Sequence, residues 1–339
     1  MIKMRTAIIT VAVLTVLAFQ VSAEGSAEAA AKEQSKPISL KLGHVAPETE
    51  PYALAAVKFA ELVKAGTNGE VTVEIFPNSQ LGSSRDLIEG LQLGSVDITL
   101  TTAAVLANFI PKSQVIELPF MFKSKEHVYK VVDGPLAAKI YEGAEAKKLK
   151  VISTWENGFR NITNNVRPIA TPADMKGIKI RVMENQMYID MFNAVGANSM
   201  PMARGELFTA LQQKTVDAQE NPMGQIYSGR FYEVQKYLSL TGHTYSPECV
   251  VFSLDAWNKI SKKNQDVILK AAAEARDFNR KLSAEKDDEF VKLVQEKGMV
   301  VTTLSPAQIA EFQKLMSPVW EKYYSVIGKD LIDQVSKFQ

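Results

Sequence analysis

The residues of this sequence with the clearest chemistry are arginines and an amide near the ends of predicted strands. In residues 176–182, apolar side chains alternate with Lys179 and Arg181, a spacing typical of a strand. A guanidinium is planar and always charged, and it can hold a carboxylate through two parallel hydrogen bonds. Arg181 is therefore a candidate to bind an organic acid, although a solvated surface arginine would have the same sequence context.

Arg160 and Asn221 stand at comparable places. Arg160 belongs to the polar run 156–165, which follows a predicted strand and lacks the apolar face of a packed element. We interpret this run as a chain crossing between two lobes, which would place Arg160 in the cleft; stacking on a neighbouring loop is the alternative. Asn221 closes a short predicted strand, because the following Pro222 disfavours helix there, and a simple turn is the alternative.

His44 and Thr102 each come just beyond a predicted strand. In open α/β sheets, ligands bind outside the carboxyl ends of the strands, so both side chains are candidate ligand contacts. A loop histidine bonded to backbone is the simpler interpretation of His44. Glu156, which opens the polar run, completes the set of candidate binding residues.

Composition and missing motifs exclude several functions. The three histidines, His44, His127 and His243, have no metal-ligand spacing. The sequence contains no phosphate-binding loop, dinucleotide-binding turn, nucleophile elbow or His-Glu-x-x-His motif. With 39 basic and 38 acidic residues, it lacks the basic excess of nucleic-acid binders. We therefore expect no cofactor, no bound metal and no nucleic-acid partner.

The elements that must position these residues alternate between strand and helix. This order predicts an α/β fold with a parallel sheet and helices on both faces. The first predicted elements are strands at 38–43, 71–76 and 96–101 and helices at 51–66 and 83–94, and a second alternation covers 178–222.

A long helix is predicted further on. Residues 262–297 contain no proline or glycine, and a helix of that length would measure roughly 50 Å. We expect it to span both lobes, with a break near 283–286 as the alternative. Residues 136–148 are also predicted as helix, residues 117–122 as an apolar loop that fills the core, and the C-terminus as short helices that begin at Ser305.

The N-terminus is typical of a secretory signal peptide. Lys3 and Arg5 precede an apolar run at 7–19, shorter than the roughly 20 residues of a membrane span, and small residues follow at 21–23. We expect cleavage after residue 23, a flexible leader at 24–36 and a periplasmic location; a retained anchor is the alternative. Cys249 is the only cysteine, so we expect no internal disulfide.

Several blocks, in order, resemble one known family. The chain from about residue 40 to its end is similar to substrate-binding proteins of tripartite ATP-independent periplasmic (TRAP) transporters, of the C4-dicarboxylate-binding type. The blocks that carry this resemblance are residues 155–160, 172–181, 196–202, 210–213 and 216–222.

The resemblance implies a periplasmic-binding-protein-like fold, with two α/β lobes, a ligand cleft between them and a long helix across both. Predicted lobe I covers 37–155 and 246–282, and lobe II covers 156–245 and 283–339. In such proteins the principal carboxylate-binding arginine corresponds to Arg181, the second arginine to Arg160 and the amide to Asn221. Other members place polar contacts at His44 and Thr102, and often an aromatic residue at Arg204; Ala218 replaces a common glycine.

The implied function is capture of a small organic acid, a C4-dicarboxylate or a sugar acid such as a hexuronate, for delivery to the membrane permease of a TRAP transporter. We expect a monomer without enzyme activity. A small monocarboxylate, keto acid or sulfonate is an alternative ligand. An exported enzyme acting on carboxylates, or a binding protein that serves a sensor kinase, is an alternative function.

Overall fold

A computed structural model describes residues 37–338 of the chain. The predicted signal peptide (1–23) and leader (24–36) lie outside the described residues. These described residues form one unit by their internal contacts.

Two long strands run through the middle of the sheet. β4 (Leu149–Asn164) pairs antiparallel with β9 (Tyr245–Ser253) along its first part. Its second part pairs antiparallel with β7 (Ala218–Pro222) and β8 (Tyr237–Leu240). Residues 156–165, interpreted from the sequence as a chain crossing that lacks the apolar face of a packed element, form a strand here, since β4 continues to Asn164. Its polar side chains are satisfied by distant partners, as in the 2.9 Å hydrogen bond from Thr163 Oγ1 to Gln235 Oε1.

The first half of the sheet contains the strands nearest the N-terminus. Its order is β2 (Val71–Phe76), β1 (Ile38–Gly43), β3 (Ile98–Thr102), β9 and β4. β1 is parallel to both neighbours, whereas β9 runs antiparallel to β3. The helices α1 (Pro51–Gly66) and α2 (Ser84–Leu93) begin and end close to their predicted bounds.

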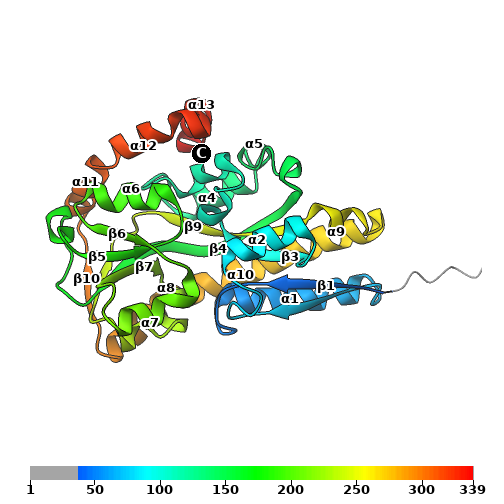
Figure 1. The fold of residues 1–339 in the computed structure, drawn as a ribbon, viewed down its shortest axis with the longest axis horizontal. Helices are drawn as coiled ribbons and strands as arrows, with labels where there is room; N and C mark the ends of the chain where they lie inside the picture. Colours follow the sequence, from blue (N-terminus) through cyan, green and yellow to red (C-terminus); the bar gives the residue numbers. More distant parts are fainter. Residues whose placement is uncertain (1–36, 339) are drawn as a thin grey trace, which may run out of the picture. The chain divides into compact units, whose positions relative to one another are not determined.

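The second half of the sheet continues from β4 to β7, β5 (Lys179–Val182) and β6 (Asn198–Pro201), with β8 and β10 (Val300–Thr303) beside it. Figure 1 shows β4 and β9 running between the strands β1–β3 and the strands β5–β7. β5 is parallel to β6 and β7. The predicted parallel sheet is thus correct for the outer strands and wrong for β4 and β9. The short β6 and β10 were not predicted.

The predicted long helix is α10 (Lys262–Glu296), 35 residues without a break, so the alternative of a break near 283–286 is wrong. It contacts α1 in the first half of the structure and α8 (Met223–Ser228) in the second half. Over the described residues, no helix combines the length and the apolar composition that a membrane span requires.

The C-terminal helices α11 (Pro306–Lys314), α12 (Ser317–Tyr323) and α13 (Lys329–Lys337) contact both halves (Figure 1, orange to red). Tyr323 donates to Asp190 of α6 (Gln186–Ala194) at 2.9 Å, and His127 of α4 (Lys125–Val132) lies 2.9 Å from the Val335 carbonyl oxygen. The predicted boundaries assign α13 to lobe II and α4 to lobe I, so this contact joins the two predicted lobes. The division into lobes at these boundaries stays a prediction.

Shorter helical segments connect these elements. The predicted helix at 136–148 is instead two short segments, interrupted at Gly143, whose φ of 87° favours glycine. The predicted core-filling loop is confirmed, because Leu118, Met121 and Phe122 are buried. The remaining segments are α3 (Ala103–Leu106), η1 (Pro111–Glu117), α5 (Ala137–Ile140), η2 (Glu145–Lys147), η3 (Pro172–Met175), η4 (Arg204–Glu206), α7 (Leu207–Gln212), η5 (Phe231–Glu233), α9 (Leu254–Asn258) and η6 (Tyr324–Gly328).

Candidate functional site

A cavity that is partly open to solvent lies where β3, β5 and β7 end and β4 passes between the two halves. Five of the seven predicted binding residues line it: Thr102, Arg160, Arg181, Arg204 and Asn221. The rule that ligands gather at strand ends pointed to Thr102, Arg181 and Asn221, because side chains at these ends converge on one edge of the sheet. Arg160 was a candidate from the polar run 156–165, and Arg204 from the family resemblance.

Arg181 is buried in the cavity wall without a neutralising carboxylate. Its side chain is on β5, and both Nε and Nη2 donate to the Met202 carbonyl oxygen, at 2.9 and 2.6 Å. The ion pairs formed by arginines within residues 37–338 involve other arginines. Burial lowers the pKa of Arg181 to about 9, which still leaves it cationic at neutral pH. A buried cation without a partner favours binding of an anion.

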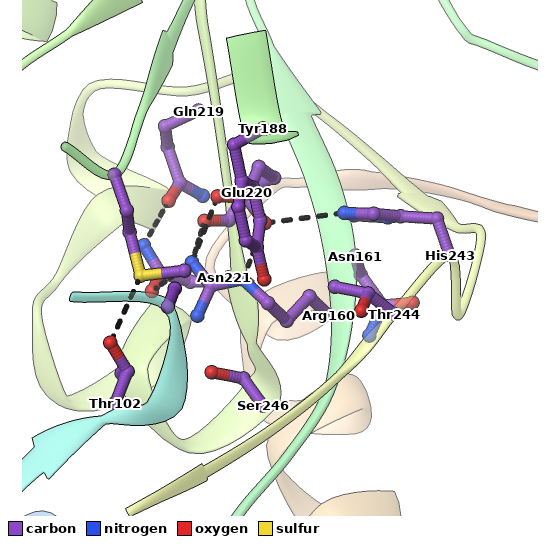
Figure 2. A network of polar contacts seen from close by, with 12 residues as sticks. Thr102, Arg160, Asn161, Tyr188, Gln219, Glu220, Asn221, His243, Thr244 and Ser246 are labelled. Atoms are coloured by element: carbon purple, nitrogen blue, oxygen red, sulfur yellow. Dashed lines mark hydrogen bonds and ion pairs between the residues drawn. The ribbon is translucent and has the colours of Figure 1, made fainter. Parts of the chain in front are cut away.

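Arg160 differs from Arg181 because the chain supplies its counter-ion. It is fully buried on β4, and Nη2 donates to Glu220 Oε1 at 2.9 Å and to Asn221 Oδ1 at 3.0 Å, while Nε also pairs with the Glu220 carboxylate. Burial opposes its charge, but the Glu220 carboxylate holds the pKa of Arg160 above its ordinary value. Nη1 alone has no partner. Figure 2 shows Arg160, Glu220 and Asn221 together, with His243 beyond them.

Asn221 is oriented by its neighbours. Because Arg160 can only donate, it fixes the Asn221 oxygen towards itself, and the Asn221 amide nitrogen donates to Gln219 Oε1 at 2.5 Å. One N–H of the Asn221 amide is then left for a ligand.

The half-buried side chain of Arg204 contacts the Gln225 amide and the Phe231 ring. Nε donates to Gln225 Oε1 at 3.2 Å, and the guanidinium carbon lies 4.8 Å from the centre of the Phe231 ring. Nη2 is buried without a hydrogen-bond partner. Burial lowers the pKa of Arg204, against the opposing effects of Tyr52 and Glu50.

Thr102 joins the two halves at the cavity edge. It is the N-cap of α3, where its hydroxyl accepts from the Val105 N–H at 3.4 Å. The same hydroxyl oxygen lies 3.5 Å from Met183 Sδ, just after β5 (Figure 2).

The structure does not bring His44 or Glu156 into the cavity lining. His44 is buried edge-to-face against Tyr52, and burial lowers its pKa to about 4, so it is neutral. The Glu156 carboxylate accepts hydrogen bonds from the hydroxyls of Tyr129 (2.7 Å) and Tyr245 (2.5 Å) and lies 3.1 Å from Lys125 Nζ. The candidate ligand contact at Glu156 is therefore corrected, because these groups occupy its carboxylate.

Sequence reasoning also missed cavity residues, among them Gln225 and Glu248. Glu248 stands next to the apolar run of β9, and this isolated acidic residue beside a buried strand was an available signal. Gln225 on α8 gave no signal. Within residues 37–338, no group of three or more His, Cys, Asp or Glu side chains is arranged to bind a metal ion.

Comparison with known proteins agrees with this site. Residues 42–326 match the family described as bacterial extracellular solute-binding protein, family 7. The chain is 37% identical over 265 residues to the 2,3-diketo-L-gulonate-binding periplasmic protein of Escherichia coli. The aligned region covers 78% of this chain and 81% of that protein.

Two solved structures are also similar. The sugar acid binding protein of Advenella mimigardefordensis in complex with galactonate is 38% identical, with a TM-score of 0.86 over 89% of this chain and 97% of that one. A TRAP periplasmic solute binding protein of a Polaromonas species, bound to D-erythronate, is 36% identical, with a TM-score of 0.86 over 88% of this chain and 98% of that one. This chain belongs to family 7 of the bacterial extracellular solute-binding proteins, and it is a two-lobed solute-binding protein of the TRAP transporter type.

Proposed function

We propose that this protein captures a small organic acid in the cavity between its two lobes, with the carboxylate of the acid on Arg181, and delivers it to the membrane permease of a TRAP transporter. The observation that carries the proposal is the position of Arg181, which is 2% exposed and lines the cavity. Nε and Nη2 each donate one hydrogen bond to the Met202 carbonyl oxygen, which leaves the second N–H of Nη2 and the N–H groups of Nη1 for a carboxylate.

The charge balance of the cavity supports an acidic ligand. Glu220 neutralises Arg160, whereas Arg181 and Arg204 have no ion-pair partner in the described part of the chain. A carboxylate between these groups would offset the cost of burying their charges, because a desolvated charge is stabilised chiefly by a partner of opposite sign.

Closure of the lobes is the proposed working motion. Side chains of the first half contact the segment after β5 through hydrogen bonds: Gln114 donates to Asn185 at 2.9 Å, and Asn108 donates to the Glu184 carbonyl oxygen at 2.9 Å. Opening would release these contacts. A ligand that bridges both lobes would then favour the closed form by the difference between its affinities for the two forms.

Several ligands fit a single buried arginine. The similar proteins above bind 2,3-diketo-L-gulonate, galactonate and D-erythronate by their descriptions. By similarity we propose a sugar acid or a C4-dicarboxylate for this chain. A small monocarboxylate, a keto acid or a sulfonate would meet Arg181 equally well and is the alternative.

Export and partners belong to the same proposal. Residues 1–23 would direct the chain to the periplasm, where the monomer would bind its acid and dock on the permease. An enzyme acting on the bound acid would need a general acid or base in the cavity, where Glu248 has a buried carboxyl group, whereas Glu156 is held by Tyr129 and Tyr245 outside the cavity lining. Incubation with each bound acid, followed by analysis for products, tests for turnover.

A thermal-shift screen tests the ligand class. At 100 times its dissociation constant, a ligand adds about 2.7 kcal/mol to the free energy of unfolding. We expect an organic acid to raise the melting temperature by several degrees. If no organic acid, keto acid or sulfonate raises it, while neutral sugars or amines do, the proposal is contradicted.

A further inference from the structure

Three buried polar atoms of cavity-lining residues have no hydrogen-bond partner in the described chain: Arg160 Nη1, Arg204 Nη2 and Glu248 Oε2. An unsatisfied buried polar atom costs about 1–3 kcal/mol, so such atoms mark places where a ligand group is expected. The two arginine nitrogens suit an acid. Glu248 needs a separate explanation, since an anionic ligand does not call for a carboxyl group in the cavity wall.

Glu248 stands at the end of a core-facing row on β9. Side chains two residues apart on a strand lie on the same face, so Glu248 shares its face with Val250 and Phe252, which are fully buried in the core against α1 and α10. Directly opposite Glu248 on β3 is Thr102, which also lines the cavity. The row thus changes from apolar to polar where the strands reach the cavity.

A chain of hydrogen bonds connects Glu248 to Arg204 around the cavity. Arg204 Nε donates to Gln225 Oε1 (3.2 Å), Gln225 Nε2 donates to Asn157 Oδ1 (3.0 Å), and Asn157 Nδ2 donates to Glu248 Oε1 (3.1 Å). Because a guanidinium can only donate, Arg204 sets the orientation of both amides. Glu248 Oε1 is therefore occupied as an acceptor, and Oε2 remains free.

The protonation state of Glu248 decides what Oε2 can bind. Burial raises the pKa of Glu248 well above its ordinary value, Glu117 and Glu50 raise it further, and Arg160 opposes them. Burial therefore favours the protonated, neutral form of this carboxyl group. Since Oε1 accepts from Asn157, the proton belongs on Oε2, which can donate to a hydroxyl oxygen and also accept from a hydroxyl group.

We propose that Glu248 binds a hydroxyl group of the captured acid, which makes the cavity selective for polyhydroxylated monocarboxylates over acids without hydroxyl groups. This inference rests on the proposed function, because it requires the carboxylate of the same acid to lie on Arg181. Glu248 would then be a specificity-determining residue rather than part of the carboxylate site.

Matched ligands test the inference by calorimetry. D-erythronate and butyrate share one carbon chain and differ in their hydroxyl groups, galactonate is a longer hydroxy acid, and succinate is a dicarboxylate without hydroxyls. We expect the native protein to bind a hydroxy acid of this panel more tightly than butyrate or succinate. Glu248→Ala should weaken hydroxy-acid binding roughly 10- to 100-fold, the effect of one lost hydrogen bond in a buried site, and change succinate binding less than about threefold.

Two further variants complete the design. Glu248→Gln retains a neutral donor, so it should keep hydroxy-acid affinity within about tenfold of the native value. Glu61→Ala removes an exposed carboxylate of α1 and should change no affinity. Melting temperatures without ligand show whether each variant is folded.

Separate outcomes would overturn the inference and the proposed function. If Glu248→Ala weakens succinate and hydroxy acids by the same factor, or if succinate is the tightest ligand of the native protein, the hydroxyl-binding role of Glu248 is wrong while acid capture stands. If no acid of the panel binds the native protein and no other organic acid raises its melting temperature, the proposed function is contradicted, and the role of Glu248 with it.

Discussion

Arg160 of β4 and Glu220 of β7 form a fully buried ion pair beside the cavity, so one of its three arginines is neutralised by the chain itself. His243 Nε2 lies 3.2 Å from the same carboxylate (Figure 2). Burial raises the pKa of Glu220, but Arg160 and His243 together outweigh this effect and leave the pKa below its ordinary value. The pair therefore acts as a charged support for Asn221, and among the cavity arginines it leaves Arg181 and Arg204 without an ion-pair partner in residues 37–338.

Glu220→Gln tests this support. It would leave Arg160 buried without its counter-ion, and breaking one partner of a buried pair costs about 3–5 kcal/mol. We expect the free energy of unfolding in urea to fall by an amount in that range. Glu233→Gln, which breaks the exposed pair with Arg230, is the matched control and should cost less than about 1 kcal/mol. Equal small losses in both variants would show that the Arg160–Glu220 pair is not critical.

A second buried carboxyl group predicts a pH dependence. Glu50, the N-cap residue of α1, accepts a hydrogen bond from Ser228 of α8, and burial raises its pKa from 4.5 to about 7. Ser228 and Arg204 lower this pKa again, while Asp287 adds to the rise. Since the folded protein holds this proton more tightly than the unfolded chain, the stabilising contribution is complete below about pH 4.5. It is lost as the pH rises to about 7.

The measurement is unfolding free energy between pH 5 and pH 8. We expect native stability to fall over this range, with Glu50 contributing on the order of 2–3 kcal/mol. Glu50→Gln, which cannot titrate, should remove that contribution and flatten the curve. Glu117, whose pKa burial also raises to about 7, will keep part of the slope. An identical slope in Glu50→Gln would contradict the role of Glu50.

Gly158 predicts a backbone effect within β4. Its φ is 125°, the pairing with β9 shifts register between Glu156 and Gly158, and an added Cβ would lie 3.3 Å from Pro222 Cβ. Gly158→Ala should therefore cost about 1–3 kcal/mol of stability. Gly143→Ala is a useful comparison, because Gly143 also has a positive φ but has no atom within 4 Å of an added Cβ. A smaller loss at Gly158 than at Gly143 would contradict the expected strain.

Local patterns in the sequence predicted much of the fold. The apolar spacing of α1, the serine cap of α2 and the absence of proline and glycine in α10 are all properties of neighbouring residues. The second half of β4 was missed because its polar side chains find partners far along the chain, such as Gln235 for Thr163. Periodicity carries no information on such pairings.

The site was predictable to a similar extent. Arg181 stood out because strand spacing placed it at the edge where ligands bind, and the family resemblance pointed to the same residue. The neutralisation of Arg160 by Glu220 was not predictable, since it depends on the antiparallel register of β4 and β7. Glu248 did carry a signal, as an acidic residue beside the apolar run of β9, but its contacts with Asn157 and Thr102 also depend on strand pairing and could not be predicted.

The most direct test of acid capture is calorimetry on Arg181 variants with the acid that most raises the native melting temperature. Arg181→Ala should weaken binding by about 3–5 kcal/mol, and Arg181→Lys should lose a good part of that, because lysine cannot form two parallel hydrogen bonds. Arg85→Ala, on the exposed surface of α2, is the matched control and should bind as the native protein does. Near-native affinity in both Arg181 variants would contradict the account.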